Sequence, residues 1–249
     1  MENPRENPRE NTPQGKRLPP LPFTSALTKP EAIAVLGYIP LHILLLPVAF
    51  TALMQRGVVD GMGANLGLYI LGLLYMLGFG WRFLRRDFDA LCDRPMQVMA
   101  EIIGSYGVML CCNMLFSFAA SALLKNTNPN NDAIAALIDE NYGAAAAMTI
   151  YMAPIVEELM FRAGIFGVLR RYNRVAAYVV GVLAFSFFHV WGFALEDPIY
   201  WIYLVQYIPV SYLLCRCYES TNSIWTPIFF HMLVNGVSVK MLSIAQELL

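Results

Sequence analysis

Three ionisable residues lie close together in one long apolar stretch. The segment MAPIVEELMFR places Glu157, Glu158 and Arg162 among hydrophobic residues. Glu158 and Arg162 are four positions apart, so on a helix they share one face, where a carboxylate and a guanidinium can form a charge-assisted ion pair. Glu157 projects about 100° away around the helix axis. It is therefore the carboxylate that remains available for chemistry.

Two further apolar segments each contain a histidine four positions away from a second residue of interest. FSFFH puts Phe185 and His189 four positions apart, and HMLVN does the same for His231 and Asn235. Each pair therefore shares a helix face. With a rise of about 1.5 Å per residue, Glu157 and the two histidines come to comparable depths in the membrane. We expect residues from three separate helices to meet in one cavity.

These residue types suit the hydrolysis of a peptide bond. A carboxylate beside a neutral imidazole can hold a water molecule and take its proton. The tetrahedral intermediate then needs hydrogen-bond donors for its oxyanion. We predict Glu157 as the base, His189 as the co-activator of the water, and His231 and Asn235 as the oxyanion donors. The predicted supporting residues are Glu158, Arg162 and Phe185.

The three segments together resemble the motifs of one family. EELMFR matches E-E-x-x-x-R, FSFFH contains F-x-x-x-H, and HMLVN matches H-x-x-x-N, in this order along the chain. The combination resembles the CPBP family, which comprises CAAX-processing type II proteases of the Ras-converting-enzyme kind and bacterial bacteriocin-processing or immunity proteins, also called Abi proteins. The resemblance covers residues 143–245. It implies an α-helical intramembrane glutamate endopeptidase that acts on a membrane-associated or prenylated (CAAX-type) protein or peptide.

Two other interpretations of the same residues stay open. Glu157, His189 and His231 are also a familiar ligand set for catalytic zinc. Because the H-E-x-x-H motif is absent and Arg162 would repel a cation, we expect no cofactor and keep a zinc-dependent protease as an alternative. The other alternative is a non-catalytic membrane scaffold or bacteriocin-immunity factor that retains the cluster as a polar clamp. A transporter is disfavoured because the sequence shows no repeat symmetry.

The rest of the chain supplies the apolar elements that must position this cluster. Of the 249 residues, 57% are hydrophobic and 14% are charged, whereas soluble domains carry about 25% charged residues. A spanning helix needs about 20 mainly apolar residues. We predict an all-α, polytopic transmembrane helix bundle of about seven or eight spans. Seven are placed, at 31–54, 64–84, 97–124, 143–169, 175–195, 198–216 and 223–245, with a short interfacial helix at 132–142.

Lysine and arginine are distributed unevenly between the two sides of this topology. Thirteen of the 17 lie on the side of the N-terminus and three on the other side, with Arg162 inside a span. Cytoplasmic loops hold an excess of these residues, which favours a cytoplasmic N-terminus. We expect an integral protein of a bacterial inner or plasma membrane, or of an ER-type membrane. Its partners would be the lipid bilayer and a membrane-associated substrate. The net charge of −1 gives no basic field for nucleic acid, and the oligomeric state stays open.

The chain divides into two predicted regions. Residues 1–30 are polar and proline-rich, include the repeat ENPRENPR, and have too little apolar surface to fold. This composition predicts a disordered cytoplasmic tail. Residues 31–249 form the predicted transmembrane protease domain, with the motifs within 143–245. The third histidine, His42, has no second polar group on its predicted face, which favours a structural role.

Overall fold

The computed structural model describes residues 23–123 and 127–248, and all of its regular structure is helical. No strand occurs in these two ranges. In chain order the elements are α1 (Lys29–Pro40), η1 (Leu41–Leu45), α2 (Leu46–Gln55), α3 (Gly61–Asp93), α4 (Pro95–Leu123), α5 (Pro129–Ala146), η2 (Ala147–Met152), α6 (Ala153–Glu158), η3 (Leu159–Phe166), α7 (Gly167–Arg170), α8 (Arg174–Phe188), α9 (Trp191–Glu196), η4 (Pro198–Tyr203), α10 (Leu204–Thr221) and α11 (Trp225–Glu247). The predicted all-α, polytopic bundle is confirmed.

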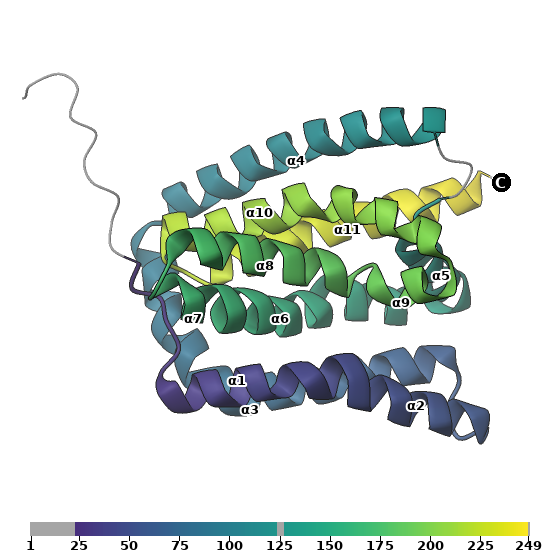
Figure 1. The fold of residues 1–249 in the computed structure, drawn as a ribbon, viewed down its shortest axis with the longest axis horizontal. Coiled ribbons are helices and arrows are strands. Elements are labelled where there is room, and N and C mark those ends of the chain that lie inside the picture. Colours follow the sequence, from purple (N-terminus) through teal and green to yellow (C-terminus); the bar gives the residue numbers. More distant parts are fainter. Residues whose placement is uncertain (1–22, 124–126, 249) are drawn as a thin grey trace, which may run out of the picture.

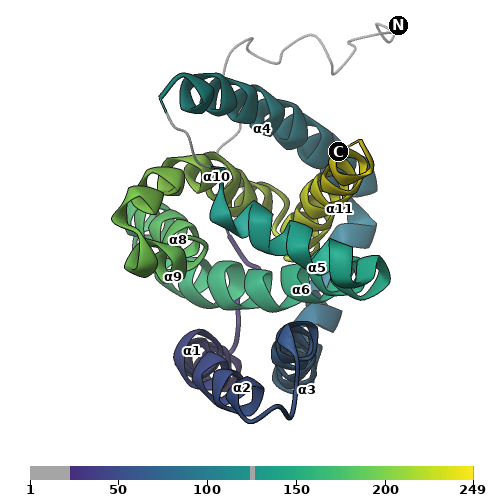
Figure 2. The same ribbon diagram turned by 90° about the vertical axis from the view of Figure 1, so that its right-hand side faces the viewer.

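The helices form a central group with a layer on each side. In Figure 2, α1, α2 and α3 lie along one side of the bundle and α4 lies along the opposite side, with α6, α8, α10 and α11 between them. Large apolar side chains on the outer surface of α4 are open to the surroundings, and Met114 and Phe118 are 72% and 80% exposed. Such a surface suits contact with lipid chains, which favour apolar side chains as a protein core does.

The segment that carries the two glutamates runs through the centre of the bundle. It consists of η2, α6, η3 and α7, and it packs against α1, α3, α8, α10 and α11. Most residues of α6 and η3 are buried, with Val156, Leu159 and Phe166 at 0% exposure, whereas Tyr151 on η2 is exposed. The wide turns of η2 end at Met152, two residues before Pro154, which has no N–H to continue regular hydrogen bonding. Glu157, Glu158 and Arg162 therefore lie in a largely buried segment of the bundle.

Five helices of the described ranges are long and apolar enough to cross a membrane. They are Lys29–Gln55, Gly61–Asp93, Pro95–Ala119, Pro198–Thr221 and Trp225–Glu247. Two predicted spans are not among these five. The span at 143–169 is helical throughout but carries three ionisable residues, and the span at 175–195 is interrupted, because α8 ends at Phe188 after 15 residues and α9 begins at Trp191.

The last residues of the predicted tail, which was placed at 1–30, are part of the folded bundle. Residues 1–22 of that tail lie outside the described ranges. Residues 23–28 pack on the bundle, with Leu27 at 1% exposure and Ser25 at 5%, and α1 begins at Lys29. The predicted interfacial helix at 132–142 corresponds to the first part of α5, whose regular helix is broken at Asn141 (φ −160°, ψ 99°).

Candidate active site

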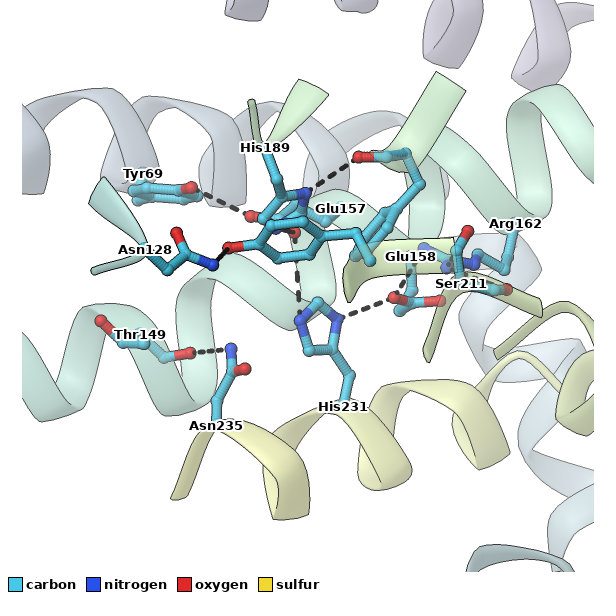
Figure 3. Close-up of polar contacts among 12 residues, drawn as sticks. Tyr69, Asn128, Thr149, Glu157, Glu158, Arg162, His189, Ser211, His231 and Asn235 are labelled. Carbon is cyan, nitrogen blue, oxygen red and sulfur yellow. Dashed lines mark hydrogen bonds and ion pairs between the residues drawn. The ribbon is translucent and has the colours of Figure 1, made fainter. Parts of the chain in front are cut away.

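The carboxyl group of Glu157 lies at the centre of the polar cluster (Figure 3). Glu157 is 3% exposed, and the hydroxyl of Tyr69, on α3, donates a hydrogen bond of 3.0 Å to its Oε1 atom. Its Oε2 atom is buried and has no hydrogen-bond partner among the residues that the structure describes. Buried polar atoms are normally hydrogen-bonded. Oε2 is therefore the carboxylate atom available to a water molecule or a substrate.

A close approach of α3 to α6 sets the position of Tyr69. Gly72 lies one turn beyond Tyr69 on α3, and a Cβ atom there would lie 2.9 Å from the hydroxyl of Tyr38 and 3.2 Å from both Cγ atoms of Val156. Val156 directly precedes Glu157. Only a residue without a side chain leaves room for this contact. Gly72 thus brings the hydroxyl of Tyr69 within reach of Glu157.

His189 directs one ring nitrogen at Glu157. Its Nδ1 atom lies 2.9 Å from the carbonyl oxygen of Phe185, one turn earlier on α8. A carbonyl oxygen only accepts, so Nδ1 carries a proton, and Nε2 of the neutral ring is an acceptor. Nε2 lies 3.7 Å from Oε2 of Glu157. The ring also stacks on Tyr207, with centroids 4.7 Å apart and planes at 28°.

His231 approaches the same carboxylate oxygen from α11. Its Nδ1 atom lies 2.8 Å from Oε1 of Glu158, and its Nε2 atom lies 4.0 Å from Oε2 of Glu157. A carboxylate that accepts from Nδ1 leaves Nε2 of the neutral ring as an acceptor. Two imidazole acceptors therefore face one carboxylate oxygen. A single water molecule between the three groups could donate one hydrogen bond to each of two of them.

The side chains of Glu158 and Arg162 form an ion pair beneath this site. Nη1 of Arg162 lies 3.1 Å from Oε1 of Glu158, as the four-residue spacing predicted, and both side chains are 0% exposed. Nη2 of Arg162 donates to the hydroxyl of Ser211, on α10, over 3.2 Å. The guanidinium also lies over the ring of Phe185, 4.0 Å from its centroid. Buried charges are retained in this way only when paired and hydrogen-bonded.

Asn235 lies one turn beyond His231 on the same helix. It is half-buried, and its Nδ2 atom donates a hydrogen bond of 2.8 Å to the carbonyl oxygen of Thr149, on η2. This contact fixes the amide orientation and uses one of its two N–H groups. Asn235 and His231 line the same cavity. The second N–H of Asn235 remains available as a donor.

The cluster forms part of the wall of a cavity of about 450 Å³. This volume falls within the range of about 300–1,000 Å³ for ligand pockets. The ionisable groups in its wall are Glu157, His189, His231 and two tyrosines, Tyr69 and Tyr207. The other polar residues of the cavity wall are uncharged, and most of them carry an amide: Asn65, Asn113, Ser117, Asn130, Asn131, Thr149, Gln206, Asn235 and Ser238.

Several contacts of the site were not predicted from the sequence. Tyr69 and Tyr207 belong to helices that carry no motif, and nothing in their spacing links them to Glu157. The contact of Glu158 with His231 joins residues 73 positions apart. The expectation that His42 has no polar neighbour was wrong, because its Nδ1 atom lies 3.3 Å from the hydroxyl of Tyr38, on the preceding turn. An aromatic residue four positions away was the available signal.

Within the described ranges, no group of three or more His, Cys, Asp or Glu side chains is arranged to hold a metal ion. The set Glu157, His189 and His231 named above for zinc is grouped instead around Oε2 of Glu157, with Nε2 atoms 3.7 and 4.0 Å from it.

Comparison with protein families decides the classification. Residues 140–237 match the family described as type II CAAX prenyl endopeptidase Rce1-like. This match supports membership of the CPBP (Abi) family. The match spans all three motifs and every residue assigned to the site except Tyr69, which lies on α3. Comparison with curated proteins gave no match, and comparison with solved structures gave none.

The similarity of residues 140–237 to this family indicates a membrane-embedded protein of the protease class. The five long apolar helices agree with this placement in a membrane.

Proposed function

We propose that this protein is an intramembrane endopeptidase that hydrolyses a peptide bond of a membrane-associated protein or peptide. The observation that carries the proposal is the position of Oε2 of Glu157, which is buried with no hydrogen-bond partner among the described residues and is faced by the Nε2 atoms of His189 and His231. Prenylated CAAX proteins are the substrate type in the name of the matched family. The proposed reaction takes place at the peptide bond, and a prenylated protein is one kind of substrate for it.

In the first step, Glu157 and His189 activate a water molecule. The water donates one hydrogen bond to Oε2 of Glu157 and another to Nε2 of His189. As the water oxygen forms a bond to the carbonyl carbon of the substrate, its proton passes to Oε2. Proton transfer to a positioned base of this kind contributes about 10²–10⁴-fold to the rate. The hydrogen bond from Tyr69 holds the other carboxylate oxygen, so that Oε2 stays directed at the cavity.

In the second step, the intermediate collapses. Its negative oxygen accepts hydrogen bonds from the N–H of Asn235 and from Nε2 of His231, which takes up a proton from solvent before the reaction and keeps it through the cycle. Glu158 supports that protonated form because its carboxylate is 2.8 Å from Nδ1 of the same ring. Glu157 then returns its proton to the leaving nitrogen as the carbon–nitrogen bond breaks. The water is consumed, and Glu157 ends in its starting state.

The test compares matched glutamate variants. Membranes of cells that express the wild type, Glu157→Gln or Glu247→Gln are compared by mass spectrometry for peptides with new termini. Glu247 is exposed at the end of α11, so Glu247→Gln makes the same chemical change outside the cavity. We expect Glu157→Gln and His189→Ala to abolish cleavage, while the protein still inserts, and Glu247→Gln to cleave as the wild type does.

Each of the two alternatives predicts a different result. A scaffold or immunity factor would keep its cellular function in both Glu157→Gln and His189→Ala. A zinc-dependent protease would lose activity in a strong chelator, recover it with added zinc, and contain stoichiometric zinc by elemental analysis. We expect activity that a chelator does not change, because the buried guanidinium of Arg162 opposes a divalent cation beside Glu157.

A further inference from the structure

The cavity extends from the polar cluster toward one end of the bundle only. Besides η2 and α6, which carry Glu157, its wall is made by α5, α9, the beginnings of α3 and α10, and the later parts of α4, α8 and α11. Figure 1 shows that these parts all lie at the right-hand end, where the C-terminus lies. Beyond Glu157 toward the left-hand end, Arg162, Phe166 and Tyr218 are 0% exposed and are absent from the cavity wall.

A packed network closes the opposite end. The hydroxyl of Tyr218 donates to the carbonyl oxygen of Ser25 over 2.8 Å, and the hydroxyl of Ser25 donates to the buried carboxylate of Asp87. That carboxylate also accepts from the backbone N–H of Ile224, at the start of α11. The ring of Phe23 packs edge-on against Tyr218, 5.0 Å away. Residues 23–28 therefore cover this end, and a substrate reaches Glu157 from the other one.

The two ends differ in charge. The closed end, where α1, α4 and α8 begin and α3, α7 and α10 end, holds most of the basic residues of the described ranges: Lys29, Arg82, Arg85, Arg86, Arg94, Arg170, Arg171, Arg174 and Arg216. The acidic residues at this end are fewer: Glu31, Asp87, Asp89, Asp93, Glu101 and Glu219. The open end holds exposed acidic residues, Asp60, Asp132, Asp139, Glu140, Glu196, Asp197 and Glu247, and only Arg56 and Lys240 as described basic residues. Lysine and arginine concentrate on the cytoplasmic side of membrane proteins. The open end is therefore the non-cytoplasmic one.

We infer that the substrate is a peptide segment presented on the non-cytoplasmic side of the membrane, uncharged where it enters the cavity and flanked by basic residues. The inference rests on the proposed peptidase function. Six amide side chains in the wall offer both donors and acceptors, which the main chain of an extended peptide requires at every residue. The acidic residues outside the cavity attract a cationic segment and repel an acidic one.

Thiol labelling tests the side on which the cavity opens. Cys92 is exposed at the closed end, and Asp139 is exposed on α5 at the open end. In a background with Cys111→Ala and Cys112→Ala, a membrane-impermeant maleimide added to intact cells should label Asp139→Cys but not Cys92. Cys92 should react only after the membrane is opened, and Cys92→Ala should remove that signal. The reverse pattern would overturn the inference.

Cleavage in sealed vesicles tests the substrate chemistry. The probes are quenched fluorescent peptides that share one uncharged polar core and are flanked by lysines or by glutamates. We expect right-side-out vesicles to cleave the lysine-flanked probe about tenfold faster or more than the glutamate-flanked one, and Asp139→Lys with Glu140→Lys to remove the difference. Equal rates, or cleavage only in inside-out vesicles, would overturn the inference.

A detergent arm separates this inference from the proposed function. In detergent both ends of the bundle are accessible, so cleavage that requires Glu157 should appear with either vesicle orientation as the source of protein. If the detergent-solubilised protein cleaves no probe and no membrane peptide, the proposed peptidase function fails together with the substrate inference. The labelling pattern still decides on which side the cavity opens.

Discussion

The imidazole of His231 is bound to the carboxylate of Glu158 inside the bundle, with Nδ1 and Oε1 2.8 Å apart. Both side chains are buried, at 4% and 0% exposure. The same carboxylate oxygen also accepts from Arg162. Glu158 thus links α6 to α11 and fixes which nitrogen of His231 faces Glu157. The second glutamate of the motif positions the histidine as well as neutralising the arginine.

Replacing Glu158 by glutamine should lower turnover more than substrate affinity. The amide cannot stabilise a protonated His231, so the oxyanion loses a donor while the cavity wall is unchanged. In metal sites, a carboxylate often holds the imidazole of a ligand histidine, and its mutation lowers metal affinity or activity about 10–100-fold. We expect a kcat loss of that size with KM within about twofold. A rise in KM with unchanged kcat would contradict the positioning role.

Replacing Arg162 by methionine should destabilise the protein strongly. The change leaves the carboxylate of Glu158 buried without its cation, and breaking a buried ion pair costs about 3–5 kcal/mol. The measurement is the free energy of unfolding in mixed micelles during titration with a denaturing detergent. The double variant Arg162→Met with Glu158→Gln removes both charges, keeps an oxygen acceptor for Nδ1 of His231, and should regain much of the stability. A double variant that is less stable than Arg162→Met would argue against the pair as the cause.

Replacing Tyr69 by phenylalanine should slow catalysis without unfolding the protein. Only the hydroxyl that donates to Oε1 of Glu157 is lost. A hydrogen bond to a charged group is worth about 1.5–3 kcal/mol, which corresponds to a loss of about 10–100-fold in kcat. Tyr75→Phe is the matched control, because Tyr75 is also half-buried on α3 and donates to the carbonyl oxygen of Ala34. Equal effects of the two variants would assign Tyr69 to packing alone.

Replacing Asn235 by alanine should remove a donor that acts in the transition state. Loss of one oxyanion donor costs about 10²–10³-fold in kcat. Ser238 lies three residues further along α11 and lines the same cavity, so Ser238→Ala tests whether any polar group there matters. We expect Ser238→Ala to change kcat by less than about threefold, on the scale of a weak neutral contact. Similar losses in both variants would favour substrate binding over oxyanion stabilisation for Asn235.

The sequence by itself determined the class of fold and predicted which groups react. Its apolar runs are too long and too poor in charge for a soluble domain, and the charged residues inside them had to face one another, since lipid offers them no partner. The pair of Glu158 with Arg162 also followed from the sequence, because an i, i+4 contact depends only on helix geometry.

The tertiary structure decided which atoms meet across helices. The contacts of Glu158 with His231, of Tyr69 with Glu157 and of Tyr207 with His189 depend on helix rotation and approach, which side-chain packing fixes and hydropathy does not encode. The end of α8 at Phe188 also depends on tertiary packing. Residues 175–195 are apolar enough for one span, yet the chain turns at His189 and directs Nε2 of this residue at Glu157. Only the packed bundle shows that the cavity opens at the acidic end.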